Sequence, residues 1–235
     1  MTWSILVRDP ATGALAAAVA TRFFAVGALC IHVEGGVAAL ATQALINPMY
    51  AVHGMAHLRA GEAPDAVVAT LLAADAGRTH RQLHILDATG RIAQHTGTDC
   101  VAWRGAVRGQ DVSVAGNMLA GPRVVEATLA TFQCATGSLP ERLLTALEAG
   151  EAAGGDKRGK QSAALKVCTA DPYPDLDIRS DDHPDPLAEL RRLHRVSLER
   201  FAVFRRFLPG TDSPCGVFDR SVIDAAVIRE GRPPI

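Results

Sequence analysis

The sequence predicts an α+β fold in which antiparallel sheets are covered by pairs of helices. Three observations favour this class. A strand pattern begins almost at the N-terminus, helical patterns come in pairs between blocks of strand patterns, and no regular β-α-β alternation runs through the chain. Doubly wound parallel sheets need that alternation, whereas separate blocks of strands and helices are typical of α+β domains. A chain of 235 residues is also long enough to bury a substantial core.

The first strand is predicted over the first nine residues, where apolar and polar side chains alternate. A period of two places Trp3, Ile5 and Val7 on one face and Thr2 and Ser4 on the other. Terminal residues are usually frayed unless a sheet holds them. This strand therefore predicts an N-terminus that is tied into the fold.

Six further strand patterns follow along the chain. Short apolar runs beside glycines, and alternating segments next to turn residues, are typical of strands. These patterns cover residues 13–20, 35–42, 81–87, 91–96, 110–115 and 162–169. The segment 171–185, rich in proline and aspartate, is expected to be a connection.

Helical patterns form two adjacent pairs and one long helix near the C-terminus. They cover residues 47–61, 63–76, 122–134, 138–150 and 186–206. Asn47 and Pro48 suit the start of the first helix, and Ser138 with Glu141 has the capping-box spacing. The long helix is amphipathic. Prolines after it end the pattern, and the last stretch has room for one more short element.

Composition narrows the class of protein. With 48% hydrophobic and 21% charged residues, the chain is expected to be globular. A net charge of -1 gives no broad basic field, so nucleic acid is not an expected partner.

No apolar run reaches the roughly 20 residues that a membrane span needs, and no signal-peptide pattern is visible. Five scattered cysteines without metal-ligand spacing suit a reducing compartment. We expect a cytoplasmic protein without a metal or other cofactor.

Thr2 is the first candidate for chemistry. An initiator methionine is commonly removed before a small residue, and removal of Met1 would leave a threonine with both a hydroxyl and a free α-amine. The reference pKa of an α-amine is about 8, so the amine can act as a general base for the hydroxyl at neutral pH. The alternative is that Thr2 is only a polar residue at the start of a strand.

Residues 154–161 nearly match the phosphate-binding pattern GxxxxGK[ST]. Gln161 replaces the hydroxyl residue, and the predicted order of helix, loop and strand is the reverse of the one that a P-loop needs. A nucleotide role is therefore not expected. The loop could instead grip an anionic or polar substrate group through Asp156, Lys157 and Arg158, or it could be a solvated turn.

Two histidine patterns invite a metal interpretation. Residues 181–185 gather three carboxylates around His183, but acidic residues suit the start of the following helix, so helix capping is the favoured interpretation. His53 and His57 have the spacing of a helical metal pair without the glutamate of HExxH, and we interpret them as helix-face residues.

Asn117, at the end of a strand, could place its amide and nearby N–H groups at an oxyanion or could belong to an ordinary turn.

Together these stretches resemble the domain-of-unknown-function 1028 family. That family is grouped with the N-terminal-nucleophile (Ntn) hydrolases, distant relatives of proteasome subunits, and has no settled substrate. The motifs that carry the resemblance lie at residues 2–5, 8–13, 41–44, 47–48, 116–122, 153–164 and 181–186. The resemblance spans roughly residues 2–206.

The resemblance implies a four-layer α-β-β-α sandwich over residues 1–206, followed by a C-terminal extension over residues 207–235. It also implies hydrolysis of an amide or peptide bond by an N-terminal residue, and Thr2 is the position that matches such a nucleophile. Self-association of the helix layers is expected by analogy with the superfamily, which makes a homo-oligomer the expected state.

Placement beside the implied cleft suggests roles for further residues. Arg22, or Arg8, is a candidate for tuning the base, and Asn117 is a candidate for oxyanion binding. The candidates for substrate binding are Ser4, Arg8, Gln43, Asp156, Lys157 and Arg158.

The leading interpretation is an amidohydrolase that acts on a small amide or peptide-like substrate. An alternative is a catalytically inert sandwich that binds a small ligand or assembles with partners, since fold does not determine function. Retention of Met1 would favour the inert protein, because it would convert the α-amine into an amide. A third option is a metal hydrolase that uses His183 and nearby aspartates.

Overall fold

Two antiparallel sheets face each other in the computed structural model, which describes residues 2–231. The six-stranded sheet has the order β10-β9-β2-β1-β8-β7 and the four-stranded sheet the order β3-β4-β5-β6. The strands of the first sheet are β1 (Thr2–Arg8), β2 (Leu15–Thr21), β7 (Gly105–Gly109), β8 (Val112–Asn117), β9 (Ser162–Cys168) and β10 (Leu176–Ser180). Those of the second sheet are β3 (Ile31–Glu34), β4 (Ala38–Ala44), β5 (Arg81–Asp87) and β6 (Ile92–Thr96).

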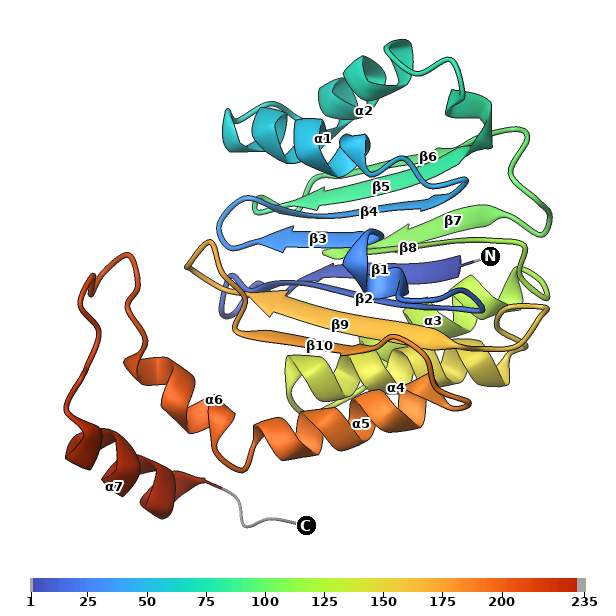
Figure 1. The fold of residues 1–235 in the computed structure, drawn as a ribbon. Helices are drawn as coiled ribbons and strands as arrows, with labels where there is room; N and C mark the ends of the chain where they lie inside the picture. The colour runs from blue at the N-terminus through green and yellow to red at the C-terminus, as the bar shows by residue number, and fades with distance from the viewer. Residues whose placement is uncertain (1, 232–235) are drawn as a thin grey trace.

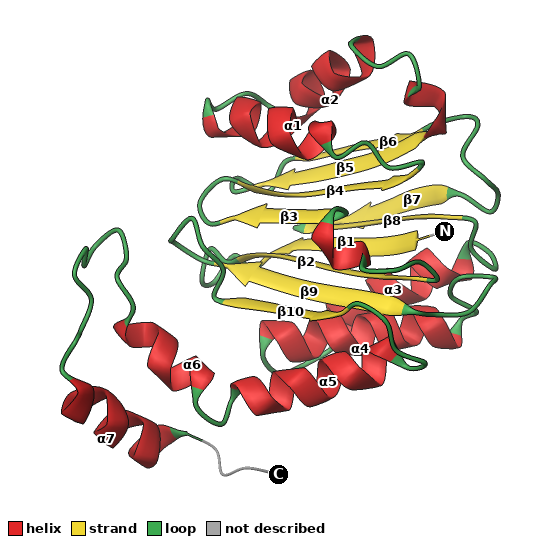
Figure 2. Ribbon diagram, viewed as in Figure 1, coloured by secondary structure: helices red, strands yellow, loops and turns green. Residues whose placement is uncertain are grey.

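Helices cover the outer face of each sheet (Figure 1, Figure 2). The four-stranded sheet carries α1 (Met49–Arg59) and α2 (Pro64–Ala73), and the six-stranded sheet carries α3 (Arg123–Cys134), α4 (Leu139–Ala152) and α5 (Pro186–Ser197). The predicted α+β class and its four-layer α-β-β-α arrangement are thereby confirmed. Two further helices, α6 (Phe201–Phe204) and α7 (Arg220–Glu230), project beyond the layers (Figure 1).

The alternation predicted for the first strand is confirmed by the packing of β1. Trp3, Ile5 and Val7 belong to the apolar core between the six-stranded sheet and its helices. Leu6 points the other way, into the core between the two sheets. Side chains of successive strand residues point to opposite faces, so β1 contributes to both interior layers.

Two of the predicted helix caps, those of α4 and α5, are confirmed, whereas the N-cap of α1 is Pro48 and not Asn47. Both hydrogen bonds of the Ser138–Glu141 capping box are present at the start of α4. Asp185 caps α5, because its Oδ1 accepts a hydrogen bond of 3.1 Å from the backbone N–H of Ala188. The acidic run before α5 thus has the capping role that the sequence favoured.

Strands β3, β7 and β10 did not appear among the sequence predictions. The expected connection over residues 171–185 is wrong, because it contains β10, which pairs with the edge of β9. Lys166 of β9 and Asp177 of β10 are paired across the strands at 2.9 Å. Charged side chains are common on edge strands. Here they made the strand resemble the acidic connection around it, so the sequence did not predict it.

The long helix predicted over residues 186–206 is also wrong. α5 ends at Ser197, and the chain turns before α6, which packs against α7. Leu187 and Leu190 anchor α5 to the core of the six-stranded sheet. Further along, the apolar side of the predicted helix contacts another helix instead of the sheet. Within residues 2–231, no helix has the length and apolar character needed to cross a bilayer.

Candidate active site

Two neighbouring strands hold Thr2 at the start of β1. The strand lies between β2 and β8 within the six-stranded sheet. The Thr2 hydroxyl donates to the hydroxyl of Thr21, at the end of β2, over 3.2 Å. On the other side, Asn117 of β8 lies opposite Thr2, and its Nδ2 donates to the Thr2 carbonyl oxygen at 3.5 Å. Thr2 is 7% exposed, so its hydroxyl has a defined position.

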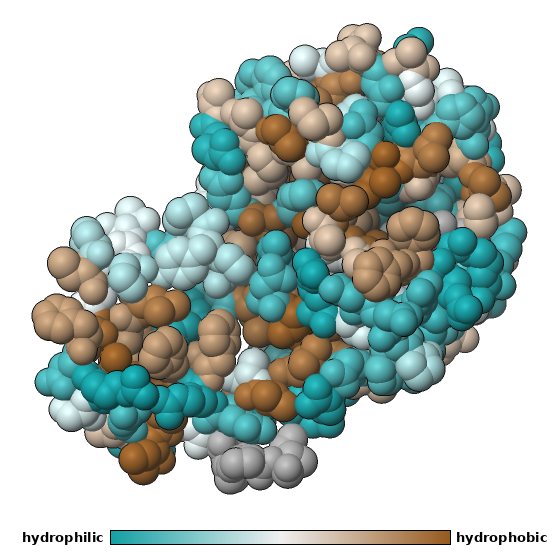
Figure 3. Space-filling view, in the orientation of Figure 1, coloured by the Kyte–Doolittle hydropathy of each residue, from teal (hydrophilic) through white to brown (hydrophobic). Residues whose placement is uncertain are grey.

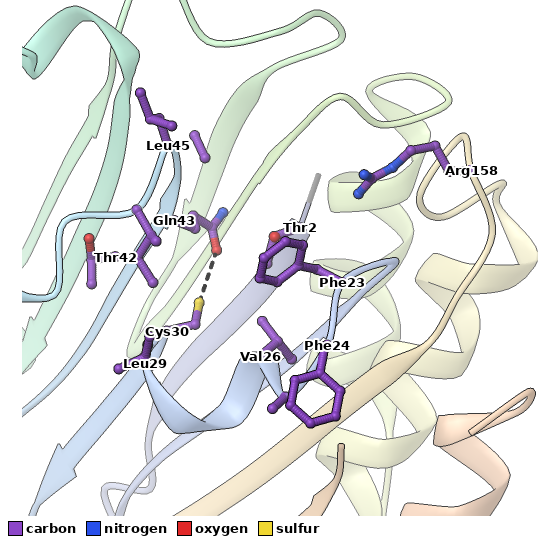
Figure 4. Close-up of a pocket in the computed structure, with 13 residues that line it drawn as sticks. Thr2, Phe23, Phe24, Val26, Leu29, Cys30, Thr42, Gln43, Leu45 and Arg158 are labelled. Atoms are coloured by element: carbon purple, nitrogen blue, oxygen red, sulfur yellow. Dashed lines mark hydrogen bonds between the residues drawn. The ribbon is translucent and has the colours of Figure 1, made fainter. Parts of the chain in front are cut away.

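A cavity of about 340 Å³ opens beside Thr2 (Figure 4). Its lining is mainly apolar. The lining residues are Thr2, Phe23, Phe24, Ala25, Val26, Leu29, Cys30, Thr42, Gln43, Ala44, Leu45, Ile46 and Arg158. Hydrophobic side chains gather on the face that carries the turn after β2 and the end of β4 (Figure 3). Exposed apolar patches commonly mark binding sites, and the volume lies at the lower end of the range for small-molecule sites.

Two alanines in the cavity wall have strained backbones. Ala25 has a φ of 51° and Ala44 a φ of 70°, both in the left-handed region. Residues other than glycine adopt it rarely, at a cost of roughly 1–2 kcal/mol. A hydrogen bond of 2.9 Å from the Ala25 N–H to the Asp181 carbonyl helps to hold the first of them. Such outliers cluster at functional sites, which supports this cavity as the candidate site.

The glycine-rich loop between α4 and β9 delivers Arg158 to the cavity. Asp156, in the same loop, is buried. Its carboxylate accepts hydrogen bonds of 2.8 Å from the backbone N–H groups of Arg22 and Arg158, and one of 3.1 Å from Arg158 Nη2. The loop follows a helix and precedes a strand, as predicted, so it lacks the architecture of a P-loop.

A buried polar layer lies between the two sheets behind the cavity. We use this name for Ser4, Gln43, Gln82, His84, Ser113 and Asn117. The Ser4 hydroxyl donates to Gln43 Oε1 at 2.7 Å. Gln82 Oε1 accepts hydrogen bonds from Gln43 Nε2 at 2.8 Å and from Asn117 Nδ2 at 3.0 Å. These bonds connect the cavity residue Gln43 to Asn117, the neighbour of Thr2.

The direction of the hydrogen bonds assigns the tautomer of His84. Because the Ser4 hydroxyl donates to Gln43, its oxygen accepts from His84 Nε2 at 2.8 Å. His84 Nδ1 then accepts from the Ser113 hydroxyl at 2.7 Å. Burial lowers the pKa of His84 to about 3, which keeps the imidazole neutral. Although Ser4 and His84 resemble a nucleophile and its base, both are fully buried, and we therefore assign them to structure.

Cys30 contributes a thiol to the cavity wall. Its Sγ donates a weak hydrogen bond to Gln43 Oε1 over 3.7 Å (dashed in Figure 4). Burial raises the pKa of the thiol to about 12. The thiolate is the reactive form of cysteine, so Cys30 is poorly suited to attack a carbonyl at neutral pH.

The structure brings five of the sequence-predicted residues together. Thr2, Gln43 and Arg158 line the cavity. Asn117 and Asp156 lie directly behind them, bonded to Thr2 and to Arg158 respectively.

The other predicted residues do not line the cavity. Arg22 is exposed and reaches the site through its backbone N–H, which binds Asp156. Ser4 is enclosed in the buried polar layer. Arg8 lies at the far end of β1, ~20 Å from Thr2 for an extended strand of this length, and pairs with Asp111 at 3.0 Å. Lys157 Nζ donates to a backbone carbonyl, that of Ala102, at 2.9 Å.

The sequence did not predict Phe23 and Phe24 as site residues, although both line the cavity. It also missed Thr21, whose hydroxyl is the partner of the Thr2 hydroxyl. A usable signal was present, because a hairpin pairs the end of its second strand with the start of its first. Trp3 and Ala20 are partners in this register, so the residues just after Ala20 must lie near Thr2. No comparable local signal marked Leu45, which lines the cavity, or His84, which lies in the buried polar layer.

The metal interpretations gain no support. His57 Nδ1 pairs with Glu62 Oε1 at 2.6 Å on the surface of α1, and the backbone N–H of Asp185 donates to His183 Nδ1 at 2.9 Å. Among residues 2–231, no group of three or more histidine, cysteine, aspartate or glutamate side chains is placed to hold a metal ion.

Comparisons with known proteins identify the family. The sequence model of a family of unknown function, DUF1028, matches residues 2–190. The crystal structure of protein SPO2555 from Silicibacter pomeroyi, described as a DUF1028 protein, is 32% identical with a TM-score of 0.86; the match covers 93% of this chain and 99% of that one. Anbu, an ancestral beta-subunit from Yersinia bercovieri, is 13% identical with a TM-score of 0.41 over 88% of this chain and 98% of its own. That weak likeness supports no inference about activity. No curated protein matches the chain. The protein belongs to the DUF1028 family.

Proposed function

We propose that the protein hydrolyses an amide or peptide bond with Thr2 as the nucleophile after removal of Met1. The observation that carries this proposal is the position of the Thr2 hydroxyl in the wall of the cavity, where Thr21 and Asn117 hold the residue. Met1 itself lies outside the described residues. The resemblance to N-terminal-nucleophile hydrolases, which enters through the family, points to the same residue.

The reaction needs two functions that a processed Thr2 would combine. The α-amine takes the hydroxyl proton as Oγ1 attacks the amide carbonyl, which gives a tetrahedral oxyanion. The resulting ammonium returns the proton to the leaving nitrogen, and the C–N bond breaks to leave an ester on Thr2. Water, deprotonated by the α-amine, then attacks the ester. The carboxylic acid leaves, and the hydroxyl of Thr2 is regenerated.

Asn117 supports Thr2 in this proposal. Its Nδ2 already donates to Gln82 Oε1 and to the Thr2 carbonyl oxygen. Both of its N–H groups therefore have acceptors, and we assign Asn117 to positioning the nucleophile. Its predicted role at the oxyanion stays a prediction, which requires the amide to change partners when substrate binds.

The test starts with the intact mass of untagged protein, which should be lower than the full sequence by one methionine. An aliphatic β-lactone then serves as a probe, because attack by a threonine hydroxyl opens the ring and adds the whole probe mass as an ester. We expect labelling at Thr2, retention of labelling in Thr2→Ser, and a loss of at least ~10³-fold in Thr2→Ala. Thr70→Ala, an identical change at an exposed position of α2, should label like the parent.

Alanine at position 2 is small enough for Met1 to be removed, as it is before threonine. Thr2→Ala therefore tests the hydroxyl alone. Continued labelling of that variant at the same rate would show that Thr2 is not the nucleophile. Retention of Met1 in unlabelled protein would favour the second candidate, a non-catalytic protein that binds a small ligand. The apolar and exposed walls of the cavity favour this candidate, because they can bind a small ligand without any reaction.

A further inference from the structure

Arg158 alone carries a charge among the described residues that line the cavity. Its guanidinium points toward the side of the cavity where Thr2 lies (Figure 4). The side chain is 43% exposed, so a ligand can reach it. A single cation facing an otherwise apolar cavity is a strong determinant of which ligands bind, because a matching anion gains a charge-assisted hydrogen bond and a neutral group does not.

Asp156 holds one edge of this guanidinium and leaves another edge free. Arg158 Nε and Nη2 donate to the two carboxylate oxygens of Asp156 at 3.4 and 3.1 Å. Within residues 2–231, Nη1 has no hydrogen-bond acceptor, and Nη2 has a second N–H. Nη1 and Nη2 form a planar fork that matches the two oxygens of a carboxylate. Asp156 is itself fixed by the backbone N–H groups of Arg22 and Arg158, so the fork is oriented before a ligand binds.

The rest of the cavity suits a small apolar group. Phe23, Phe24 and Leu45 are each more than 60% exposed. A bound hydrocarbon group or aromatic ring would cover these side chains. Burial of such surface drives binding. At about 340 Å³, the cavity fits a small ligand better than a folded chain.

We propose that the substrate is a small amide that carries a free carboxylate and an apolar group, such as an N-acyl amino acid or a short apolar peptide. Arg158 binds the carboxylate, and the side chains around Phe23 and Leu45 hold the apolar group next to Thr2. The inference rests on the proposed function, since it takes the ligand of this cavity to be the substrate of Thr2.

A different role for Arg158 makes a different prediction. A nearby cation disfavours the charged form of an amine. In the alternative role, Arg158 keeps the Thr2 α-amine neutral and does not bind the ligand. In that case a carboxylate and its neutral carboxamide would bind equally well. Carboxylate recognition requires that they differ.

The test is titration calorimetry with N-benzoylglycine and N-benzoylglycinamide, which differ in the terminal charge. Thr2→Ala protein is used, so that binding is measured without turnover. We expect the acid to bind at least ~10-fold more tightly than the amide. Arg158→Gln should reduce the preference to about twofold or less, and Arg158→Lys, which keeps the charge without the fork, should reduce it partly. Arg195→Gln removes an exposed charge on α5 and should keep the full preference.

Equal affinity for the two compounds, or no binding of either, would overturn the carboxylate site, even if the Arg158 variants fail to fold. A preference for the acid that survives in Arg158→Gln protein of normal thermal stability would overturn the role of Arg158. A strong preference in protein whose Thr2 is never labelled by the β-lactone would retain the carboxylate site and reject the hydrolase, so the two proposals fail separately.

Discussion

The two faces of β1 differ in chemistry although they belong to seven consecutive residues. The face toward α3 and α4 is apolar, with Trp3, Ile5 and Val7 in one continuous core. The face toward the second sheet begins with Thr2 and Ser4 and becomes apolar only at Leu6. The polar part is the part nearest the cavity.

This difference separates stability from positioning. An apolar interior is the default because it needs no hydrogen bonds, and Leu6 shows that such packing fits between the sheets. Buried polar side chains must be paired to avoid a desolvation cost. In the buried polar layer, the pairing of Ser4, Gln43 and His84 locks their orientations. We infer that the helix-facing side of β1 supplies stability and the sheet-facing side holds the wall of the cavity in place.

The largest effect is expected on the helix-facing side. Trp3 is fully buried, and Trp3→Ala should lower the free energy of unfolding by about 3–5 kcal/mol, because it removes apolar contacts and leaves a cavity. Denaturant unfolding measures the change. Phe218→Ala is the control, since Phe218 is 88% exposed and its loss should change stability by less than about 0.5 kcal/mol. A loss below about 1 kcal/mol in Trp3→Ala would break the comparison.

A smaller loss is expected on the sheet-facing side. Ser4→Ala leaves Gln43 Oε1 and His84 Nε2 without this partner, which should cost about 1–3 kcal/mol. Combining it with His84→Leu should cost less than the sum of the two single changes, because both variants disrupt the same pair. Strict additivity in this double-mutant cycle would show that the polar layer is not a coupled unit.

The smallest effect concerns acidity. His84 is neutral in the folded protein because burial lowers its pKa to about 3, whereas the pKa of an unfolded histidine is about 6.5. As the pH falls below 6.5, the unfolded state takes up a proton that the folded state does not, so stability decreases. The free energy of unfolding should fall by about 1 kcal/mol between pH 6 and pH 5 through His84 alone. His84→Leu should lack this component, and identical pH curves for the two proteins would contradict a buried neutral imidazole.

Much of the fold was predictable from local patterns. The segments that became β1, β5 and α4 each carry a complete local signal: a period of two, an alternating run beside a glycine turn, and a capping box before an apolar helix face. β10 escaped prediction because its strand character depends on pairing with β9. Its own composition, rich in aspartate next to prolines, is typical of a connection.

The candidate site was predictable only in part. Thr2 follows from its place at the N-terminus, and Arg158 from its place in a glycine-rich loop. Local patterns alone did not place them in one cavity; the family resemblance implied it, and the contact depends on Asp156 joining that loop to the turn after β2. The link between Ser4 and His84 is likewise invisible in sequence, because 80 positions separate them and a sheet-to-sheet contact brings them together.

The sequence by itself determined most of the strands and helices, the two faces of β1 and the candidate nucleophile, because side-chain periodicity and local capping depend on near neighbours. The tertiary structure alone decided which polar side chains share the interior, which thiol and serine are closed to solvent, and which cation faces Thr2. The buried features depend on the packing of two sheets against each other, in which residues distant in sequence exclude water together. The position of the cation, Arg158, depends on the hydrogen bonds of Asp156.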